Sequence, residues 1–144
     1  MTASLLFDTS VYIAVLRDAT FAAEFRWRYL RAIPRTHFSS VVVQELLAGA
    51  RTPRHRKLAL ALYEPFEGAE RIVTPTHAIW KEAGNLLATL AEKRPGYRSK
   101  LSRGLLTDVL IALSGRAIGA TVVTRNADDF HLVREFSNFD LEVV

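Results

Sequence analysis

At 144 residues, the chain is long enough to form one domain with a sizeable hydrophobic core, without disulfides or a structural metal. It contains no cysteine, which excludes disulfides, thiolate metal sites and cysteine nucleophiles. The sequence has no secretory signal pattern and no apolar run approaching the ~20 residues of a membrane-spanning helix, so we expect a cytoplasmic protein without a membrane partner. The net charge of +4 and the isoelectric point near 9.8 favour an anionic partner, with nucleic acid ahead of a membrane surface.

The first half of the chain is typical of short apolar strands separated by longer helices. Thr9 or Ser10 offers a hydroxyl N-cap for the first helix, Pro34 ends the second, and Ser39 or Ser40 caps the third. The predicted elements are a strand at 4–8, helices at 10–17 and 20–33, a strand at 36–40, helices at 41–50 and 53–66, and a strand at 71–75.

The second half continues this alternation. A helix is predicted at 77–93, and a break at Pro95 and Gly96 leads into a basic loop. Ser102 is expected to cap a helix at 103–118, which Gly119 would end as a C′ glycine. The remaining elements are a strand at 120–125, a turn or short helix at 126–133 and a final strand at 141–144. Because we find no internal repeat and no linker, we expect one domain over residues 1–144.

Short apolar strands that alternate with helices indicate βαβ units, and therefore an α/β fold whose central parallel sheet is covered on both faces. In such folds, binding and catalytic residues gather beyond the carboxyl ends of the strands. Asp8 lies at the end of its predicted strand, and so do Thr124, Arg125 and Asn126. The sequence therefore places polar side chains at the edge of the sheet where a site is expected.

Three carboxylates lie in apolar surroundings: Asp8 in LLFDTSVYIAVL, Glu45 in VVVQELL and Asp108 in GLLTDVLIAL. An isolated charge is expensive to bury, so such acids are normally paired, hydrogen-bonded or bound to a metal. Taken one at a time, each has an ordinary structural explanation as a helix cap or an ion-pair partner. Taken together at one edge of a parallel sheet, they would repel one another and raise one another's pKa unless a cation neutralised them.

A hard divalent cation, Mg²⁺ or alternatively Mn²⁺, prefers oxygen ligands and is typically held by one or two carboxylates with water and phosphate oxygens. The three acids therefore predict phosphoryl or phosphodiester chemistry. The segment TRNADDF adds oxygen donors at the same edge: Thr124, Asn126, Asp128 and Asp129. For at least one of the two aspartates, capping or solvating a turn is the simpler interpretation.

Four motifs in order along the chain resemble the PIN-domain ribonucleases: a strand running into DTS, the helix acid of VVVQELLAG, the helix segment TDVLIA and the late segment VVTRNADDF. The resemblance is strongest to the VapC-like toxins of bacterial and archaeal toxin–antitoxin pairs, and it covers nearly the whole chain. It implies a PIN-like (Rossmann-like) three-layer α/β/α sandwich and metal-dependent endoribonuclease activity. It also implies an RNA substrate, a cognate antitoxin and a homodimer.

Carried over position by position, the resemblance assigns three catalytic acids. Asp8 and Asp108 are expected to bind Mg²⁺ directly, and Glu45 to bind a second metal ion or to position water. A water activated by the metal would then attack a phosphodiester bond.

The fourth acidic position of the family corresponds to Asn126, because TRN stands here where other members have TRD. Asn126 can still coordinate a metal through its amide oxygen or orient water, and Asp128 or Asp129 can compensate. The hydroxyl side chains expected beside the acids, where they would orient metal-bound water, are Thr9, Thr107 and Thr124.

Basic residues suggest where RNA phosphates would bind. The candidate residues are Arg51, Arg54, Arg56, Lys57, Arg98 and Lys100, and the alternative is that they are solvated helix ends and loops. The four histidines show no metal-binding spacing. Trp27, in a helix of alternating charge, is interpreted as core or interface packing rather than a base-stacking platform.

Two rival interpretations remain. A haloacid-dehalogenase-like phosphotransfer domain also uses a strand-end aspartate. It needs a second acid next to Asp8 or two residues away, and a lysine after the late strand, and the sequence has neither. The same fold can also belong to a catalytically weak or inactive protein that binds RNA or an antitoxin, with Asn126 marking the decay of the site.

Overall fold

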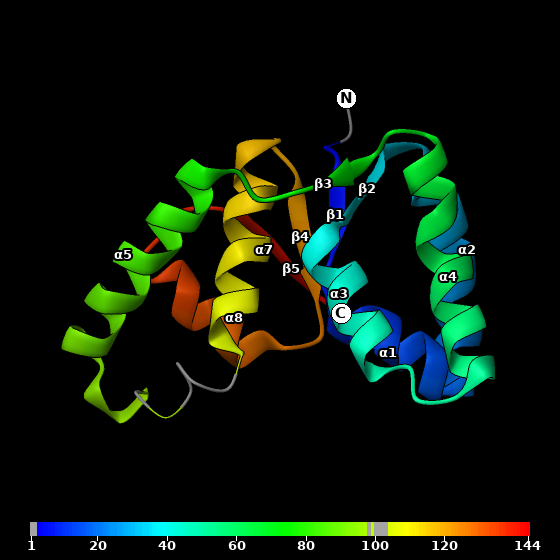
Figure 1. The fold of residues 1–144 in the computed structure, drawn as a ribbon, viewed down its shortest axis with the longest axis horizontal. Helices are drawn as coiled ribbons and strands as arrows, with labels where there is room; N and C mark the ends of the chain where they lie inside the picture. Colours follow the sequence, from blue (N-terminus) through cyan, green and yellow to red (C-terminus); the bar gives the residue numbers. More distant parts are fainter. Residues whose placement is uncertain (1–2, 98, 100–103) are drawn as a thin grey trace.

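The computed structural model describes residues 3–97, 99 and 104–144, in which strands and helices alternate as predicted (Figure 1). The first elements are β1 (Leu5–Phe7), α1 (Thr9–Arg17), α2 (Ala19–Ala32), a 3₁₀ turn (Ile33–Arg35), β2 (Thr36–Ser39), α3 (Ser40–Gly49) and α4 (Pro53–Gly68). They are followed by β3 (Ile72–Val73), α5 (His77–Lys93), a 3₁₀ turn (Pro95–Tyr97), α7 (Leu105–Ala117), β4 (Thr121–Thr124), α8 (Ala127–Arg134) and β5 (Asp140–Val143).

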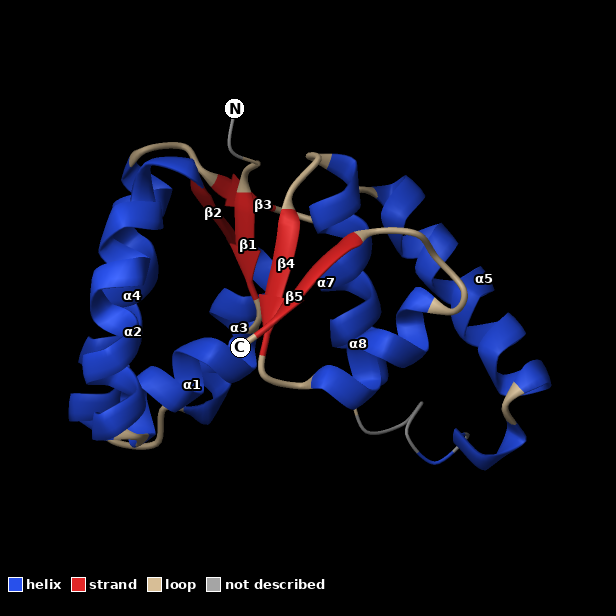
Figure 2. Cartoon of the chain, turned by 180° about the vertical axis from the view of Figure 1, so that it is seen from behind, coloured by secondary structure: helices blue, strands red, loops and turns tan. Residues whose placement is uncertain are grey.

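The five strands form one sheet in the order β3-β2-β1-β4-β5, and every neighbouring pair is parallel. β1 lies at the centre, with Leu5 aligned to Thr36 of β2 on one side and to Thr121 of β4 on the other. Helices α1, α2 and α4 lie on one side of the sheet, and α5, α7 and α8 on the other (Figure 1, Figure 2). The predicted fold, a central parallel sheet between two layers of helices, is confirmed.

The strand order reverses direction at β1. The chain moves outward from β1 through β2 to β3, then crosses the sheet and adds β4 and β5 on the other side of β1. In open parallel sheets, ligands bind beyond the carboxyl ends of the strands at such a reversal. The topology therefore points to the ends of β1 and β4 as the place for a site.

Helix α7 packs directly on this central part of the sheet. Nine of its thirteen residues are buried, which agrees with a helix that is apolar on nearly all sides. It approaches the sheet tightly at Gly115, where a Cβ atom would lie 2.7 Å from Val122 Cγ2 of β4. A glycine is needed here because the helix touches the strand, and this contact fixes the position of the rest of α7.

The structure corrects or completes the predicted helix ends. Helix α1 is capped by Asp8, whose Oδ2 accepts from the Ser10 N–H, so the prediction of a cap by Thr9 or Ser10 was wrong. Helix α7 begins after Gly104, which has a left-handed φ of 108°, and the predicted cap at Ser102 lies outside the described residues. The segment 126–133, which the sequence left open as a turn or short helix, forms α8.

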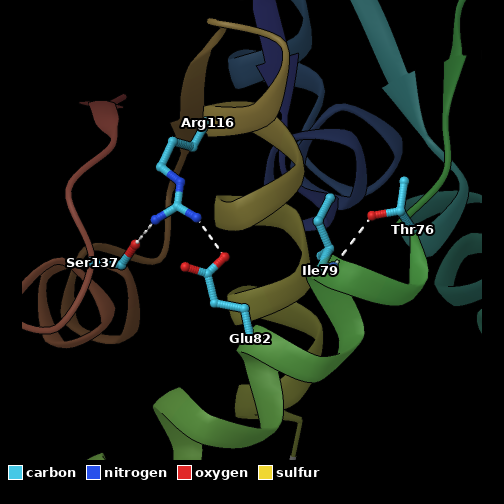
Figure 3. A network of polar contacts seen from close by, with 5 residues as sticks. All are labelled: Thr76, Ile79, Glu82, Arg116 and Ser137. Atoms are coloured by element: carbon cyan, nitrogen blue, oxygen red, sulfur yellow. Dashed lines mark hydrogen bonds and ion pairs between the residues drawn. The ribbon is translucent and has the colours of Figure 1, made fainter.

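A polar network joins the elements of the second helical layer (Figure 3). Arg116 of α7 donates to Glu82 of α5 and, at 2.8 Å, to Ser137 beyond α8. Thr76 caps α5 by accepting from the Ile79 N–H at 3.2 Å. Exposed contacts of this kind each contribute up to about 1 kcal/mol, so their main effect is to fix how α5, α7 and the segment after α8 lie against one another.

The two tryptophans lie largely in solvent. Trp27 of α2 is 68% exposed, so its interpretation as core packing was wrong, and packing at an interface stays a prediction. Trp80 of α5 is 49% exposed. The core is instead rich in buried phenylalanine and tyrosine side chains, such as Phe7, Tyr12 and Phe38. No helix in the described part of the chain is both long and apolar enough to cross a bilayer.

Candidate functional site

Asp8 lies at the carboxyl end of β1, and its backbone N–H donates to the Val123 carbonyl of β4 at 2.9 Å. The residue is only 3% exposed. Its Oδ2 accepts hydrogen bonds from Ser10 Oγ at 2.7 Å and from Thr124 Oγ1 at 2.8 Å, while Oδ1 accepts none from the residues that the structure describes. Two hydroxyl donors and the helix cap stabilise the buried charge, and one oxygen atom is left for a further partner.

Glu45 lies on α3, partly buried, and faces the start of α1. Thr9 Oγ1 donates to its Oε1 at 2.6 Å. Burial raises the pKa of the Glu45 carboxyl, the Thr9 hydrogen bond opposes that rise, and the nearby charge of Asp8 adds to it. On its other side, Glu45 lines a hollow of about 70 Å³ between α1, α3 and α4, which it shares with Arg17 and His55.

Asp108 lies in the first turn of α7 and is 8% exposed. Its pKa is raised from 3.8 to about 8, first by burial and then by the charges of Asp8, Asp129 and Glu45. A carboxyl whose pKa responds to other acids lies within electrostatic range of them. The three acids chosen from the sequence therefore lie near enough to interact, and Asp129, which also hydrogen-bonds to Asp108, lies with them.

The polar side chains of TRNADDF differ in whether they contact the acids. Asn126 Nδ2 donates to Asp129 Oδ2 at 3.0 Å and, more weakly, to Asp108 Oδ2 at 3.5 Å. Asp128 is exposed, as expected of an acid that solvates a helix start. Asn126 thus presents its amide nitrogen to the acids, whereas coordination of a metal would require its oxygen. Of the two aspartates, Asp129 is the one placed at the cluster.

The three threonines differ in what they contact. Thr9 and Thr124 donate to Glu45 and Asp8, and Thr124 Oγ1 also accepts from the Asn126 N–H at 2.8 Å. Thr107 Oγ1 donates at 2.6 Å to the Gly104 carbonyl and so closes the first turn of its own helix. Hydroxyl contacts to the acids are therefore present for Thr9 and Thr124.

The basic residues lie at the rim. The exposed side chains at and before the first turn of α4 are Arg51, Arg54, Arg56 and Lys57. They surround His55, which lines the hollow beside Glu45, so this cluster flanks the acids. Arg98 and Lys100 lie outside the described residues. Arg94, near them in sequence, forms an ion pair with Glu135 at 2.7 Å.

Two residues at the site, Ser10 and Arg125, were not among the site residues predicted from the sequence. Ser10 donates to Asp8 and accepts from the Arg125 N–H at 3.0 Å, so its hydroxyl joins two segments 115 positions apart. Arg125 lies at the rim, with its guanidinium over the ring of Phe21. Ser10 is visible in DTS and Arg125 in TRN, but nothing in the sequence shows that the two motifs touch.

The donor set suits a hard cation. In residues 3–97, 99 and 104–144, no three carboxylate or imidazole side chains form a ready-made metal cage. Acids that repel one another do not assemble into such a cage unless a cation holds them together. Mg²⁺ needs only one or two carboxylates, because it keeps several of its waters. Asp8 and Asp108 are two such acids, and no ion pair to either is present in the described part of the chain.

The family follows from comparison with known proteins. A model of the PIN domain family matches residues 5–135, so the chain belongs to this family, whose members are generally nucleases. No curated protein sequence gives a significant match.

Solved structures of complexes named VapBC share the fold. A chain of the DNA-bound VapBC from Salmonella typhimurium is 21% identical, with a TM-score of 0.68, over 99% of this chain and 98% of that one. A chain of VapBC-5 from Mycobacterium tuberculosis, a member of the VapBC family of toxin–antitoxin systems, is 22% identical, with a TM-score of 0.58, over 99% and 98%. For VapBC-1 from nontypeable Haemophilus influenzae the values are 19%, 0.64, 96% and 96%. The PIN-like fold implied by the sequence motifs is confirmed.

Proposed function

We propose that this PIN-domain protein is an Mg²⁺-dependent endoribonuclease and the toxin of a toxin–antitoxin pair. The observation that carries the proposal is the convergence of four acids at the reversal point of a parallel sheet. They are Asp8, Glu45, Asp108 and Asp129, and the pKa of Asp108 is raised first by burial and then by the charges of the other three acids. A protein gains nothing in stability from such an arrangement unless a cation is bound there.

Asp8 and Asp108 are the residues that would hold Mg²⁺, with Mn²⁺ as a second suitable ion. A bound divalent ion supplies charge stabilisation at the scissile phosphate and lowers the pKa of an attacking water. The hydroxyls of Ser10 and Thr124 fix Asp8 Oδ2, so that Oδ1 points to one defined position. Positioning by such outer contacts typically changes metal affinity or activity by about 10- to 100-fold.

Glu45 is suited to take the proton of the attacking water. Thr9 occupies its Oε1 at 2.6 Å, and Oε2 is left to accept the proton. Its raised pKa brings the carboxyl closer to neutral pH, where a general base is most effective. Asn126 donates to Asp108 and Asp129 and so orients both acids at the site.

RNA is the proposed substrate. The basic residues around His55 flank Glu45 on one side of the acids, where they would contact phosphates of the strand being cleaved. Recognition of RNA depends largely on shape and on unpaired bases, so the target RNA follows from the loops around the site rather than from these charges.

The proposed antitoxin has a suitable binding surface on the first helical layer. An apolar groove of about 220 Å³ lies between α1, α2 and α4, lined by side chains that include Val15, Phe25, Leu30 and Leu62. Arg26 lies at the same groove and can pair with an acidic residue of the partner. The groove is suited to apolar side chains of an extended or helical segment. An RNA substrate and an antitoxin partner support the proposed cytoplasmic location.

A homodimer is proposed through the opposite side of the molecule. A hollow of about 370 Å³ is lined by Trp80, Pro75, Val41, Leu106 and Leu110, most of it apolar. A large exposed indole beside such a hollow is typical of a protein interface. Substitution of Trp80 by glutamate is expected to give a monomer in light scattering, and an unchanged dimer would contradict the assignment.

The test of the nuclease proposal compares wild-type protein with Asp8→Asn on structured RNAs. Cleavage is expected with Mg²⁺ and not with EDTA, and Asp8→Asn is expected to lower it by about 100-fold or more. The control, Asp140→Asn, makes the same change at an exposed position of β5 and should cleave like wild type. Circular dichroism checks that both variants fold. Full activity in Asp8→Asn would refute the site, and Mg²⁺-independent binding without cleavage would identify the inactive alternative.

A further inference from the structure

The acid cluster poses an electrostatic problem for its proposed substrate. Ionised carboxylates among Asp8, Glu45, Asp108 and Asp129 would repel an RNA phosphate that binds beside them. The basic cluster at the start of α4 lies near Glu45, because His55 within it lines the same hollow. The loop between β4 and α8 contributes a further cationic side chain, Arg125.

We propose that Arg125 is a substrate-binding residue that contacts an RNA phosphate immediately beside the acid cluster, with Phe21 positioning its guanidinium for that contact. The inference rests on the proposed function and names a residue to which neither the family match nor the sequence motifs assign a role. Its ligand is the phosphodiester backbone of RNA.

The backbone of Arg125 is anchored to the acid site. Its N–H donates to Ser10 Oγ at 3.0 Å, and the same hydroxyl donates to Asp8 Oδ2 at 2.7 Å. The next residue, Asn126, is held in the same way, because its N–H donates to Thr124 Oγ1. The main chain at Arg125 therefore cannot move without disturbing Asp8, which places the root of the arginine side chain at a fixed point on the rim.

The side chain is positioned by an aromatic stack. The guanidinium carbon of Arg125 lies 4.3 Å from the centroid of the Phe21 ring. Phe21 in turn stacks on Phe25, with centroids 5.1 Å apart and planes inclined by 15°. A cation–π contact at an exposed site is weak, so it favours one orientation of the guanidinium but does not prevent a better ligand from binding.

In the structure the guanidinium lies on the ring and does not pair with the acids. An arginine directly between Thr124 and Asn126 has carboxylates nearby to pair with, yet no such pair involves Arg125 in the described ranges of the chain. An arginine over a ring face retains N–H donors along its edge, and these match the geometry of a phosphate. The arrangement leaves the acids to a metal ion and Arg125 to the anion that the metal helps to bind.

A purely structural role makes different predictions. If Arg125 serves only to hold α2 against the loop between β4 and α8, its removal lowers Tm and has no specific effect on RNA. If Arg125 binds phosphate, its removal weakens RNA binding at low salt and reduces the salt dependence, while Tm falls only by the small amount that the loss of one exposed cation–π contact causes. The two roles are therefore separated by measuring binding and thermal unfolding on the same variants.

The experiment uses fluorescence anisotropy with a labelled single-stranded RNA of mixed sequence, in EDTA so that no cleavage occurs. Arg125→Ala is expected to weaken binding by about 5- to 10-fold and to reduce the slope of log K against log salt by about 0.7, the value for one phosphate contact on a single strand. Phe21→Leu, which keeps the apolar volume but removes the ring, is expected to weaken binding by about 2-fold. Arg134→Ala, at the exposed end of α8, removes the same charge and should bind like wild type within about 1.5-fold.

Cleavage with Mg²⁺ completes the test. Arg125→Ala is expected to raise KM by about the same factor as Kd, with kcat nearly unchanged. Wild-type binding by Arg125→Ala, or losses equal to those of Arg134→Ala, would overturn the inference while the nuclease proposal stands if wild-type protein still cleaves. If wild-type protein binds RNA through Arg125 but cleaves none, the inference holds and the nuclease proposal fails.

Discussion

Replacing Asp108 by asparagine is expected to stabilise the metal-free protein at neutral pH. The pKa of Asp108 is raised from 3.8 to about 8, so between these two pH values the folded chain holds a proton that the unfolded chain has lost. Stability therefore falls as pH rises through this window, by about 1.4 kcal/mol per pH unit for a single group. At pH 7, roughly three units above the unfolded pKa, Asp108 lowers the free energy of unfolding by at most about 4 kcal/mol.

The asparagine variant avoids this cost. We expect Asp108→Asn to be more stable than wild type by about half of that upper bound, roughly 2 kcal/mol or about 6 °C in Tm, because the amide must replace a carboxyl within the same hydrogen bonds. Thermal unfolding in EDTA, followed by far-ultraviolet circular dichroism, measures the difference. Mg²⁺ should raise the Tm of the wild-type protein, because it neutralises the acids in the folded state, and should have little effect on Asp108→Asn.

The matched control is Asp140→Asn, an exposed aspartate at the start of β5 for which we expect neither effect. Wild-type stability in EDTA should fall from about pH 5 to about pH 8, whereas that of Asp108→Asn should fall less. A variant that is no more stable than wild type near pH 7, or equal Mg²⁺ stabilisation in both proteins, would show that burial and the neighbouring acids do not raise the pKa of Asp108 as the structure indicates.

Three further predictions follow from single contacts. Gly115→Ala is expected to destabilise the protein by about 1–3 kcal/mol, because its Cβ would overlap Val122. Gly84→Ala, at an exposed position of α5 with open space around it, should be neutral or stabilising. Urea unfolding compares the two variants, and equal effects would contradict the close contact at Gly115. Thr124→Val removes a hydrogen-bond donor to Asp8 and an acceptor for the Asn126 N–H. The variant should lower the rate of RNA cleavage by about 10-fold in an RNase assay. Cleavage at the wild-type rate would show that Asp8 does not need this hydrogen bond for its position. Asn126→Asp adds a negative charge beside Asp108 and Asp129. The Tm in EDTA should therefore fall by a few degrees, and the increase in Tm on adding Mg²⁺ should be larger than in wild type. A Tm in EDTA equal to that of wild type would show that residue 126 does not lie beside the acids.

The positions of Asp8, Glu45 and Asp108 could be predicted because each acid interrupts an apolar run whose period is readable. A strand-end acid in a parallel sheet, and acids on helices that follow such strands, have few places to lie other than the carboxyl edge. Their convergence required only the fold class. The same reasoning correctly kept Asn126 near the acids, but it could not decide which amide atom faces them.

The choice between Asp128 and Asp129 depended on an element that the sequence left open. Once 127–134 is a helix, its phase is set by the buried side chains Phe130 and Val133. Asp129 then lies beside Asn126, three residues earlier, and Asp128 turns to solvent. The contacts of Ser10 and Arg125 were beyond prediction for another reason: they join residues 115 positions apart, and only the register of β1 against β4 brings them together.

The exposure of both tryptophans determines what the intrinsic fluorescence of this protein reports. Indoles that are 68% and 49% exposed in the folded state already sense water, so unfolding is expected to change their emission little. Trp80 lies in the hollow proposed for a second copy, and Trp27 lies on the helix that carries Arg26 of the antitoxin groove. Emission from these two side chains should therefore shift to shorter wavelength when partners dock, and unlabelled protein carries its own reporters of assembly.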